Sequence, residues 1–375
     1  MKDFKQLAMP GPVALKPYTP GKPVEVLERE LGITGSIKLA SNENPLGCSA
    51  TVTAAVQAAL GGEFFARYPD ASGHELKSDL AAHHGITADR ITLGNGSNDI
   101  LVLLAQALLG PGRASVFSGY AFAVYPIATA AASGEARVAS ALGPDSAMPY
   151  GHDLDAMRAL IDDDVRLVFV ANPNNPTGTW LEPDAFEAFL RDVPEDVVVV
   201  LDEAYHHYQP EEWRIDSRRL LDAYPNLVVT RTFSKIYGIA ALRIGYGLSH
   251  PALADILNRV RQPFNNNAVA HVAARAALAD EEFVDESVAT NLTGLARIRQ
   301  GLDDLGLGYL PTHTNFLTFD LGRDAASVYE AMLREGVIVR PLAGYGMPNH
   351  LRTTIGTADE NERFLAALGR VLGGQ

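Results

Sequence analysis

Apolar runs alternate with helical patterns along most of the chain. Helical spacing is found at 50–60, 97–110 and 153–161. Between these segments lie short runs rich in valine and isoleucine, at 90–94, 114–117, 166–171, 196–202, 226–232 and 243–249. Because these runs are almost wholly apolar, they predict strands that are buried on both faces, as in a parallel sheet covered by helices. The alternation of strands and helices predicts an α/β fold.

The two ends of the chain depart from this pattern. Residues 1–35 are rich in proline and glycine and predict an extended arm with one short helix near 24–32. A long helical pattern runs from about Asn267 to Leu305. After it come predicted strands at 315–321, 337–340 and 351–356, a helix at 324–335 and a last helix from Asp359. We therefore predict an N-terminal arm (1–35), a large domain (36–280) and a small α+β C-terminal domain (281–375).

Composition narrows the class of protein. The chain has 375 residues, of which 47% are apolar, which is enough for a large core and two domains. Its net charge of −14, without a basic block, argues against a nucleic-acid partner. The longest aliphatic run, VVVVL at 197–201, is far too short to span a membrane, and the N-terminus lacks an apolar stretch of signal-peptide length. The single cysteine, Cys48, fits a reducing compartment, so we expect a cytoplasmic protein.

Polar side chains follow the predicted strands, at the ends where open α/β sheets bind ligands. Asp202 ends the run DVVVVLD, Asn175 follows RLVFVA, and Lys235 follows NLVVTRT. Any one of them alone is more typical of a cap, a turn or a solvated surface lysine. Several polar side chains at strand ends, all suited to binding the same kind of ligand, predict a shared ligand site.

The side chains at these ends favour an aldehyde cofactor with a pyridine ring. Lys235 would lie at the rim of a cleft, where it is partly removed from water and is near the like charge of Arg243. Partial desolvation and the like charge each lower the pKa of an amine and make it a better nucleophile. Asp202 ends five aliphatic residues, so its carboxylate should be partly buried and need a cation. A protonated pyridine nitrogen would serve, and that proton makes the ring an electron sink.

The segment GNGSND (94–99) opens a predicted helix with small residues and hydroxyl groups. Backbone N–H groups at a helix start favour a phosphate. The segment is not a dinucleotide fingerprint, because Asp99 stands where a third glycine would be needed. An ordinary helix cap at Ser97 is the alternative interpretation.

Five motifs together resemble one enzyme family: NENPLG (42–47), RYPD (67–70), NPNNPTG (172–178), DEAY (202–205) and SKIYGIAALRIGY (234–246). They resemble the fold-type-I pyridoxal-phosphate aminotransferases, closest to the histidinol-phosphate aminotransferase group, from about Leu15 to Gly369. The resemblance implies an aspartate-aminotransferase-like fold and pyridoxal 5′-phosphate as cofactor. It further implies transamination of L-histidinol phosphate with 2-oxoglutarate, a reaction of histidine biosynthesis that gives imidazole acetol phosphate and glutamate.

The resemblance also implies roles for residues around the cofactor. Lys235 would bind the aldehyde and move a proton, Asp202 would hold the pyridine nitrogen, and Asn175 and Tyr205 would hydrogen-bond the ring's phenolic oxygen. Tyr120, in SGYAF, would stack on the ring, unless it is a packed core residue. The phosphate would be held by Gly96, Ser97, Thr232, Ser234 and Arg243. Asn98 stands where the family often has an acidic residue, and IYGIAALR after the lysine also departs from the common pattern.

Further positions concern the substrate and a second subunit. Tyr68, in RYPD, matches a residue that reaches the phosphate from the neighbouring subunit, which implies a homodimer with shared sites. Arg352 matches the arginine that clamps a substrate carboxylate. Substrate contacts are implied for Tyr18, Asn42, Asn315, Arg340 and Arg352. Tyr18 could instead pack the arm, Arg340 could form a surface ion pair, and Asn315 could cap a strand.

Enzymes that catalyse other reactions share these motifs. Aromatic amino-acid aminotransferases have nearly all of them, and threonine-phosphate decarboxylases share the phosphate-binding arginines but release CO₂. A regulator that uses this fold as a ligand sensor is disfavoured, because it would need a DNA-binding extension. Here only about 40 residues precede NENPLG, and they are not basic.

Overall fold

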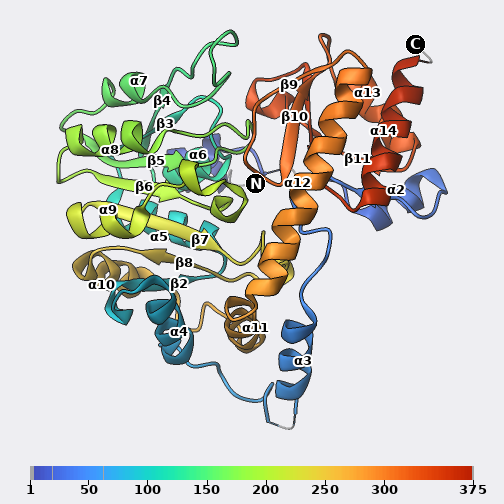
Figure 1. The fold of residues 1–375 in the computed structure, drawn as a ribbon. Coiled ribbons are helices and arrows are strands. Elements are labelled where there is room, and N and C mark those ends of the chain that lie inside the picture. Colours follow the sequence, from blue (N-terminus) through green and yellow to red (C-terminus); the bar gives the residue numbers. More distant parts are fainter. Residues whose placement is uncertain (1–3, 19, 62, 374–375) are drawn as a thin grey trace.

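Helices cover both faces of a seven-stranded sheet in the computed structural model, which describes residues 4–18, 20–61 and 63–373 (Figure 1). The strand order is β2-β8-β7-β6-β5-β3-β4. The strands are β2 (Ile91–Gly94), β3 (Ala114–Ser118), β4 (Glu135–Ala139), β5 (Val165–Ala171), β6 (Val198–Asp202), β7 (Leu227–Thr232) and β8 (Gly245–Leu248). Strands β3 to β7 pair in parallel, which confirms the predicted mostly parallel sheet.

Alternate residues of the central strands pack into two separate cores. In β5, Val168 and Val170 join one apolar cluster, whereas Leu167 and Phe169 join the other. The first cluster is closed by α3 (Ala50–Ala59), α4 (His74–His84), α7 (Leu154–Arg158), α8 (Pro183–Asp192), α9 (Ser217–Ala223) and α11 (Ala268–Leu278). The second is closed by α5 (Ser97–Leu108), α6 (Val124–Ala131) and α10 (Pro251–Val260). The continuous apolarity of the strands follows from burial on both faces.

A smaller sheet with the order β12-β13-β10-β9 lies beside the large one (Figure 1). Its antiparallel strands are β9 (Gly308–Tyr309), β10 (Phe316–Asp320), β12 (Arg340–Pro341) and β13 (His350–Thr354). Its apolar cluster is closed by α12 (Glu281–Asp304), α13 (Ala326–Arg334) and α14 (Ala358–Gly373). The division of the chain at residue 280 remains a prediction. One departure from it is clear, because β1 (Ile37–Lys38), assigned to the large domain, pairs in parallel with β11 (Val337–Ile338).

Four local predictions are corrected by the structure. The helical pattern from Asn267 to Leu305 is two helices, since Asp280 accepts a hydrogen bond from the Phe283 backbone N–H and begins α12. The predicted strand 337–340 divides into β11 and β12, which belong to different sheets. The arm carries α1 (Pro10–Ala14) as well as the predicted helix α2 (Val24–Leu31). Strand β8 is antiparallel to both neighbours, because the chain returns from β7 without a crossover helix.

No helix among the described residues is both long enough and apolar enough to cross a bilayer.

The cap at Asp280 gives a stability prediction. Asp280→Ala removes the side-chain acceptor for the first turn of α12 and should lower the free energy of unfolding by about 1 kcal/mol. Denaturant unfolding measures the loss. Asp285→Ala, at an exposed position of the same helix, is the control and should leave stability nearly unchanged. Equal losses in the two variants would remove the cap from the explanation.

Candidate active site

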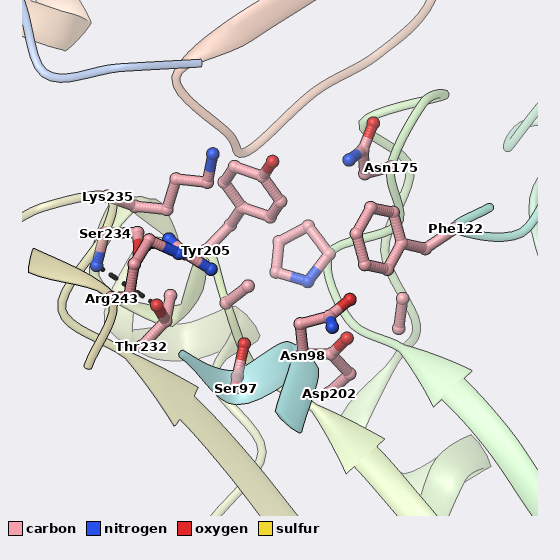
Figure 2. Close-up of a pocket in the computed structure, with 13 residues that line it drawn as sticks. Ser97, Asn98, Phe122, Asn175, Asp202, Tyr205, Thr232, Ser234, Lys235 and Arg243 are labelled. Atoms are coloured by element: carbon pink, nitrogen blue, oxygen red, sulfur yellow. Dashed lines mark hydrogen bonds between the residues drawn. The ribbon is translucent and has the colours of Figure 1, made fainter. Parts of the chain in front are cut away.

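A cleft opens at the carboxyl ends of β5, β6 and β7, next to the N-terminus of α5 (Figure 2). It holds about 640 Å³ of empty space, including the part that opens to solvent. Its lining comprises Ser97, Asn98, Phe122, Ala171, Pro173, Asn175, Asp202, Ala204, Tyr205, Thr232, Ser234, Lys235 and Arg243. Most of the residues that the sequence assigned to catalysis and cofactor binding therefore meet in one place.

Asp202 is the last residue of β6, and it is 5% exposed. Its Oδ2 accepts a hydrogen bond from Tyr125 Oη at 2.9 Å, and its Oδ1 accepts one from Thr230 Oγ1 at 3.0 Å. Burial raises the pKa of the carboxyl, and the two hydrogen bonds act in the opposite direction. The next residue, Glu203, pairs with Arg231 at 2.7 Å, but Asp202 has no such cation among the residues that the structure describes. A protonated ring nitrogen in the cleft would supply one.

Lys235 lies in the loop after β7 and points toward the same cleft (Figure 2). Its Nζ donates a hydrogen bond to the Ser41 carbonyl oxygen at 3.1 Å. Burial, and next the positive charge of Arg352, lower the pKa of this amine to about 7. A large fraction of the side chain is then uncharged at neutral pH, and this is the form that attacks a carbonyl carbon. The surface-lysine interpretation does not fit this environment.

One end of the cleft is built to hold an anion. The N-terminus of α5 lies near Thr232, Ser234 and Arg243 (Figure 2). Arg243 Nη1 donates to Ser234 Oγ at 3.2 Å and to the Ala240 carbonyl oxygen at 3.0 Å. Gly96, just before the helix, has a φ of 83°, and a Cβ there would lie 2.6 Å from Arg243 Nη2. Only glycine fits this position, and the hydroxyls, backbone N–H groups and guanidinium form a donor set suited to a phosphate.

A phenol and an amide lie on the walls of the cleft. Tyr205 is 3% exposed, and its Oη accepts a hydrogen bond from Asn42 Nδ2 at 2.8 Å. Burial raises the pKa of the phenol to about 12, so the hydroxyl keeps its proton at neutral pH and can donate. Asn175 accepts a hydrogen bond from Arg352 through its Oδ1. The two side chains that the sequence expected to hold one cofactor oxygen therefore both line the cleft.

Two arginines stand opposite each other on the strands of the small sheet, since Arg340 on β12 is in register with Arg352 on β13. Arg352 is 5% exposed and donates to the Ala40 carbonyl oxygen at 2.8 Å, and its Nε is buried without a partner in the described structure. Burial lowers the pKa of this guanidinium. Arg340 Nη2 donates a hydrogen bond to Tyr18 Oη at 3.5 Å. The guanidinium carbon of Arg340 lies over the Tyr18 ring, 5.4 Å from the ring centroid. A buried arginine with an unused donor is a natural site for an anion.

The aromatic wall of the cleft is Phe122, whereas the sequence assigned that position to Tyr120 (Figure 2). Tyr120 lies outside this cleft, with its ring edge-to-face against Tyr150 at 5.1 Å. Both aromatics precede α6, and spacing alone could not tell which would face inward. Phe122, unlike Tyr120, packs against Tyr125, with 5.9 Å between ring centroids, and this contact distinguishes the aromatic that faces the cleft.

Asn42, Asn315 and Tyr68 are also predicted residues that lie outside the cleft lining. Asn315 is 1% exposed, its Nδ2 donates to the Asn42 carbonyl oxygen at 3.0 Å, and its Oδ1 has no partner among the described residues. Asn42 donates a hydrogen bond to the hydroxyl of Tyr205, which lines the cleft, but Asn42 is not itself part of the lining. Tyr68 is 81% exposed and stacks on Phe264 at 4.5 Å on the surface. The substrate contacts expected of the two asparagines therefore stay predictions.

Two hydroxyl residues that contact Asp202 were not identified from the sequence. Thr230 had a weak signal, because it lies two residues before Thr232 in β7 and so points to the same face. Tyr125 had none, since its helix is far from β6 in the sequence. No group of three or more His, Cys, Asp or Glu side chains that could hold a metal ion is found in the described part of the chain.

Comparisons with known proteins agree with this geometry. A family model described as aminotransferase class I and II matches residues 34–368. The chain is 55% identical over 374 residues to histidinol-phosphate aminotransferase 2 of Pseudomonas aeruginosa, covering 99% of each protein.

Solved structures show the same fold. Histidinol-phosphate aminotransferase from Sinorhizobium meliloti, in complex with pyridoxal-5′-phosphate, has a TM-score of 0.89 at 29% identity and covers 98% of both chains. A double mutant of Thermus thermophilus aspartate aminotransferase, with a TM-score of 0.84 at 24% identity, covers 97% of this chain and 99% of its own, and shows the fold alone. The predicted resemblance and fold class are therefore confirmed, and the chain belongs to the aminotransferase class I and II family.

Proposed function

We propose that this protein is a pyridoxal 5′-phosphate-dependent aminotransferase that moves the amino group of L-histidinol phosphate to 2-oxoglutarate in histidine biosynthesis. One observation carries the proposal. A single cleft contains a lysine amine with a pKa lowered to about 7 and a buried carboxylate that pairs with no cation in the described part of the chain. The relatives named for histidinol phosphate, at 55% identity, support the choice of substrate.

The residues of the cleft fit this cofactor. When bound, pyridoxal 5′-phosphate supplies an aldehyde that takes up amino groups and a protonated ring that withdraws electrons. Asp202 would pair with the ring nitrogen, and Phe122 would cover a face of the ring. The phosphate would be held by the N-terminus of α5 with Ser97, Asn98, Thr232, Ser234 and Arg243. Tyr205 and Asn175 would hydrogen-bond the phenolic oxygen.

Lys235 is the residue that moves protons. As an uncharged amine near neutral pH, its Nζ can take the proton from the donor's Cα and deliver it to the carbon that carried the cofactor's aldehyde, which is general acid–base catalysis. A base works best when its pKa is close to the working pH. The burial that lowers the pKa of Lys235 therefore prepares the side chain for this role.

The anionic end of the substrate would meet Arg340, Arg352 and Tyr18. Histidinol phosphate has a phosphate and an imidazole but no carboxylate, whereas 2-oxoglutarate has two carboxylates. A guanidinium binds either group through paired N–H donors. The same arginines can therefore serve both half-reactions, and Tyr18 Oη adds a hydroxyl beside Arg340.

We also propose a homodimer in which Tyr68 completes the phosphate site of the neighbouring subunit. Exposed aromatic side chains support this, since Phe65 is 74% exposed, Tyr68 81% and Phe264 43%. Aromatic surface of this kind is enriched at protein interfaces. In one chain Tyr68 contacts Phe264 and is absent from the cleft lining, so a role at a phosphate requires a second chain.

The location and the remaining partners follow from composition. We propose a cytoplasmic protein, which the single cysteine supports because secreted proteins usually pair their cysteines. We propose no nucleic-acid partner, since the net charge of −14 opposes binding to phosphate backbones. Cell fractionation of the source organism tests the location, and recovery in a membrane or extracellular fraction would contradict it.

Parallel assays with three donors test the function. The purified enzyme receives 2-oxoglutarate with histidinol phosphate, phenylalanine or threonine phosphate, and glutamate and CO₂ are measured. We expect glutamate with histidinol phosphate, because that donor matches the two arginines. Faster turnover of phenylalanine would support an aromatic amino-acid aminotransferase instead, and CO₂ from threonine phosphate would support a decarboxylase.

Arg340→Ala tests how the substrate phosphate is bound. We expect kcat/KM for histidinol phosphate to fall about 10- to 100-fold, because a charged hydrogen bond is lost, and kcat/KM for phenylalanine to change much less. Arg334→Ala, on the exposed surface of α13, is the matched control and should leave both values unchanged. Equal losses for both donors in Arg340→Ala would show that Arg340 does not bind the phosphate.

Co-expression of two defective variants tests the shared site. Tyr68→Ala removes the phenol that would complete the phosphate site, and Lys235→Ala removes the amine that would bind the cofactor. If Tyr68 acts across the dimer, a mixed dimer contains one site with both residues intact, and activity should exceed that of either variant alone. Mixed dimers without such recovery would place Tyr68 in its own subunit's site or in neither.

A further inference from the structure

Asp202 is held by two hydroxyl groups that come from different elements. Tyr125, on α6, donates from Oη to Oδ2 at 2.9 Å, and Thr230, on β7, donates from Oγ1 to Oδ1 at 3.0 Å. Each carboxylate oxygen therefore has one hydroxyl donor outside its own strand. The carboxylate cannot rotate without breaking one of these bonds, and it faces the cleft (Figure 2).

The ring of Tyr125 is buried among other aromatic rings. It has 0% exposure and stacks on Phe169 of β5 with 4.6 Å between centroids and 4° between planes. It also meets Phe122 edge-to-face at 5.9 Å and 87°. Phe122 lines the cleft, so one side chain supports both the carboxylate and the aromatic wall.

The hydroxyl of Tyr125 can act only as a donor toward Asp202. Burial, and next the charge of Asp202, raise the pKa of the phenol well above its ordinary range, so it keeps its proton. A hydrogen bond to a charged group is stronger than one between neutral groups. The bond therefore favours the ionised carboxylate in a place where burial alone favours the neutral acid.

We propose that Tyr125 is a positioning residue for Asp202: its hydroxyl keeps the carboxylate charged and aimed into the cleft, so that it can pair with the protonated ring nitrogen of the cofactor. Thr230 contributes in the same way to the other oxygen. This inference rests on the proposed function for the identity of the cofactor, but it does not depend on which amino donor the enzyme uses.

The test compares two cofactors in three single variants of the full-length protein. Tyr125→Phe and Thr230→Val each remove one hydroxyl and keep the packing. Tyr246→Phe is the control, since Tyr246 is also buried and its Oη lies 2.8 Å from His84 Nε2, away from the cleft. The cofactors are pyridoxal 5′-phosphate and 1-deazapyridoxal 5′-phosphate, in which carbon replaces the ring nitrogen. The dissociation constant of each cofactor is measured by titration.

We expect Tyr125→Phe to weaken binding of pyridoxal 5′-phosphate about 10- to 100-fold, with a change in the same direction for Thr230→Val. Binding of the deaza cofactor should not change, because that ring offers Asp202 no charged partner. Tyr246→Phe should leave both dissociation constants unchanged.

Two results would overturn the inference. Equal weakening of both cofactors by Tyr125→Phe would mean that Tyr125 only maintains the shape of the cleft, and unchanged affinity for both would mean that its hydroxyl is not needed. Failure of the proposed substrate is recognised separately, because the cofactor affinities are measured without an amino donor. Failure of wild-type protein to bind pyridoxal 5′-phosphate at all would contradict the proposed function itself.

Discussion

A buried carboxylate that has no cationic partner among the residues the structure describes is the constraint on which the site depends. Asp202 ends a central strand, and removing a carboxylate from water is costly unless hydrogen bonds and an opposite charge compensate. Two hydroxyls compensate in part. The remaining charge is directed into the cleft (Figure 2), where it would favour a ligand with a protonated ring nitrogen over a neutral one.

Positive charge is concentrated elsewhere in the same cleft and beside it. Arg352 lies in the small sheet, yet its charge is the largest effect after burial on the pKa of Lys235. The guanidinium that would bind the substrate anion therefore also helps to keep the lysine amine uncharged. Because the large sheet supplies Asp202 and Lys235 and the small sheet supplies Arg352, the packing of the two sheets couples substrate binding to the reactivity of the amine.

Sequence reasoning found the residues whose signals are local. Asp202, Asn175 and Lys235 follow apolar runs, and such runs reliably end where a parallel sheet meets its loops. Residues whose roles depend on distant packing were missed or misplaced. In GYAFAVY (119–125) Phe122 faces the cleft and packs against Tyr125, which itself stacks on Phe169 of another strand, and spacing cannot show these contacts. Asn315 donates a hydrogen bond to the carbonyl oxygen of Asn42, 273 positions away, a contact that the sequence could not show.

Reductive trapping tests the central claim most directly. The purified protein is treated with borohydride and digested with trypsin, and the peptides are analysed by mass spectrometry. The account predicts a phosphopyridoxyl group on the ε-amine of Lys235, and its loss in Lys235→Ala. A peptide containing Lys235 that carries no added mass, or a cofactor trapped on a different lysine, would contradict the assignment of this cleft as the active site.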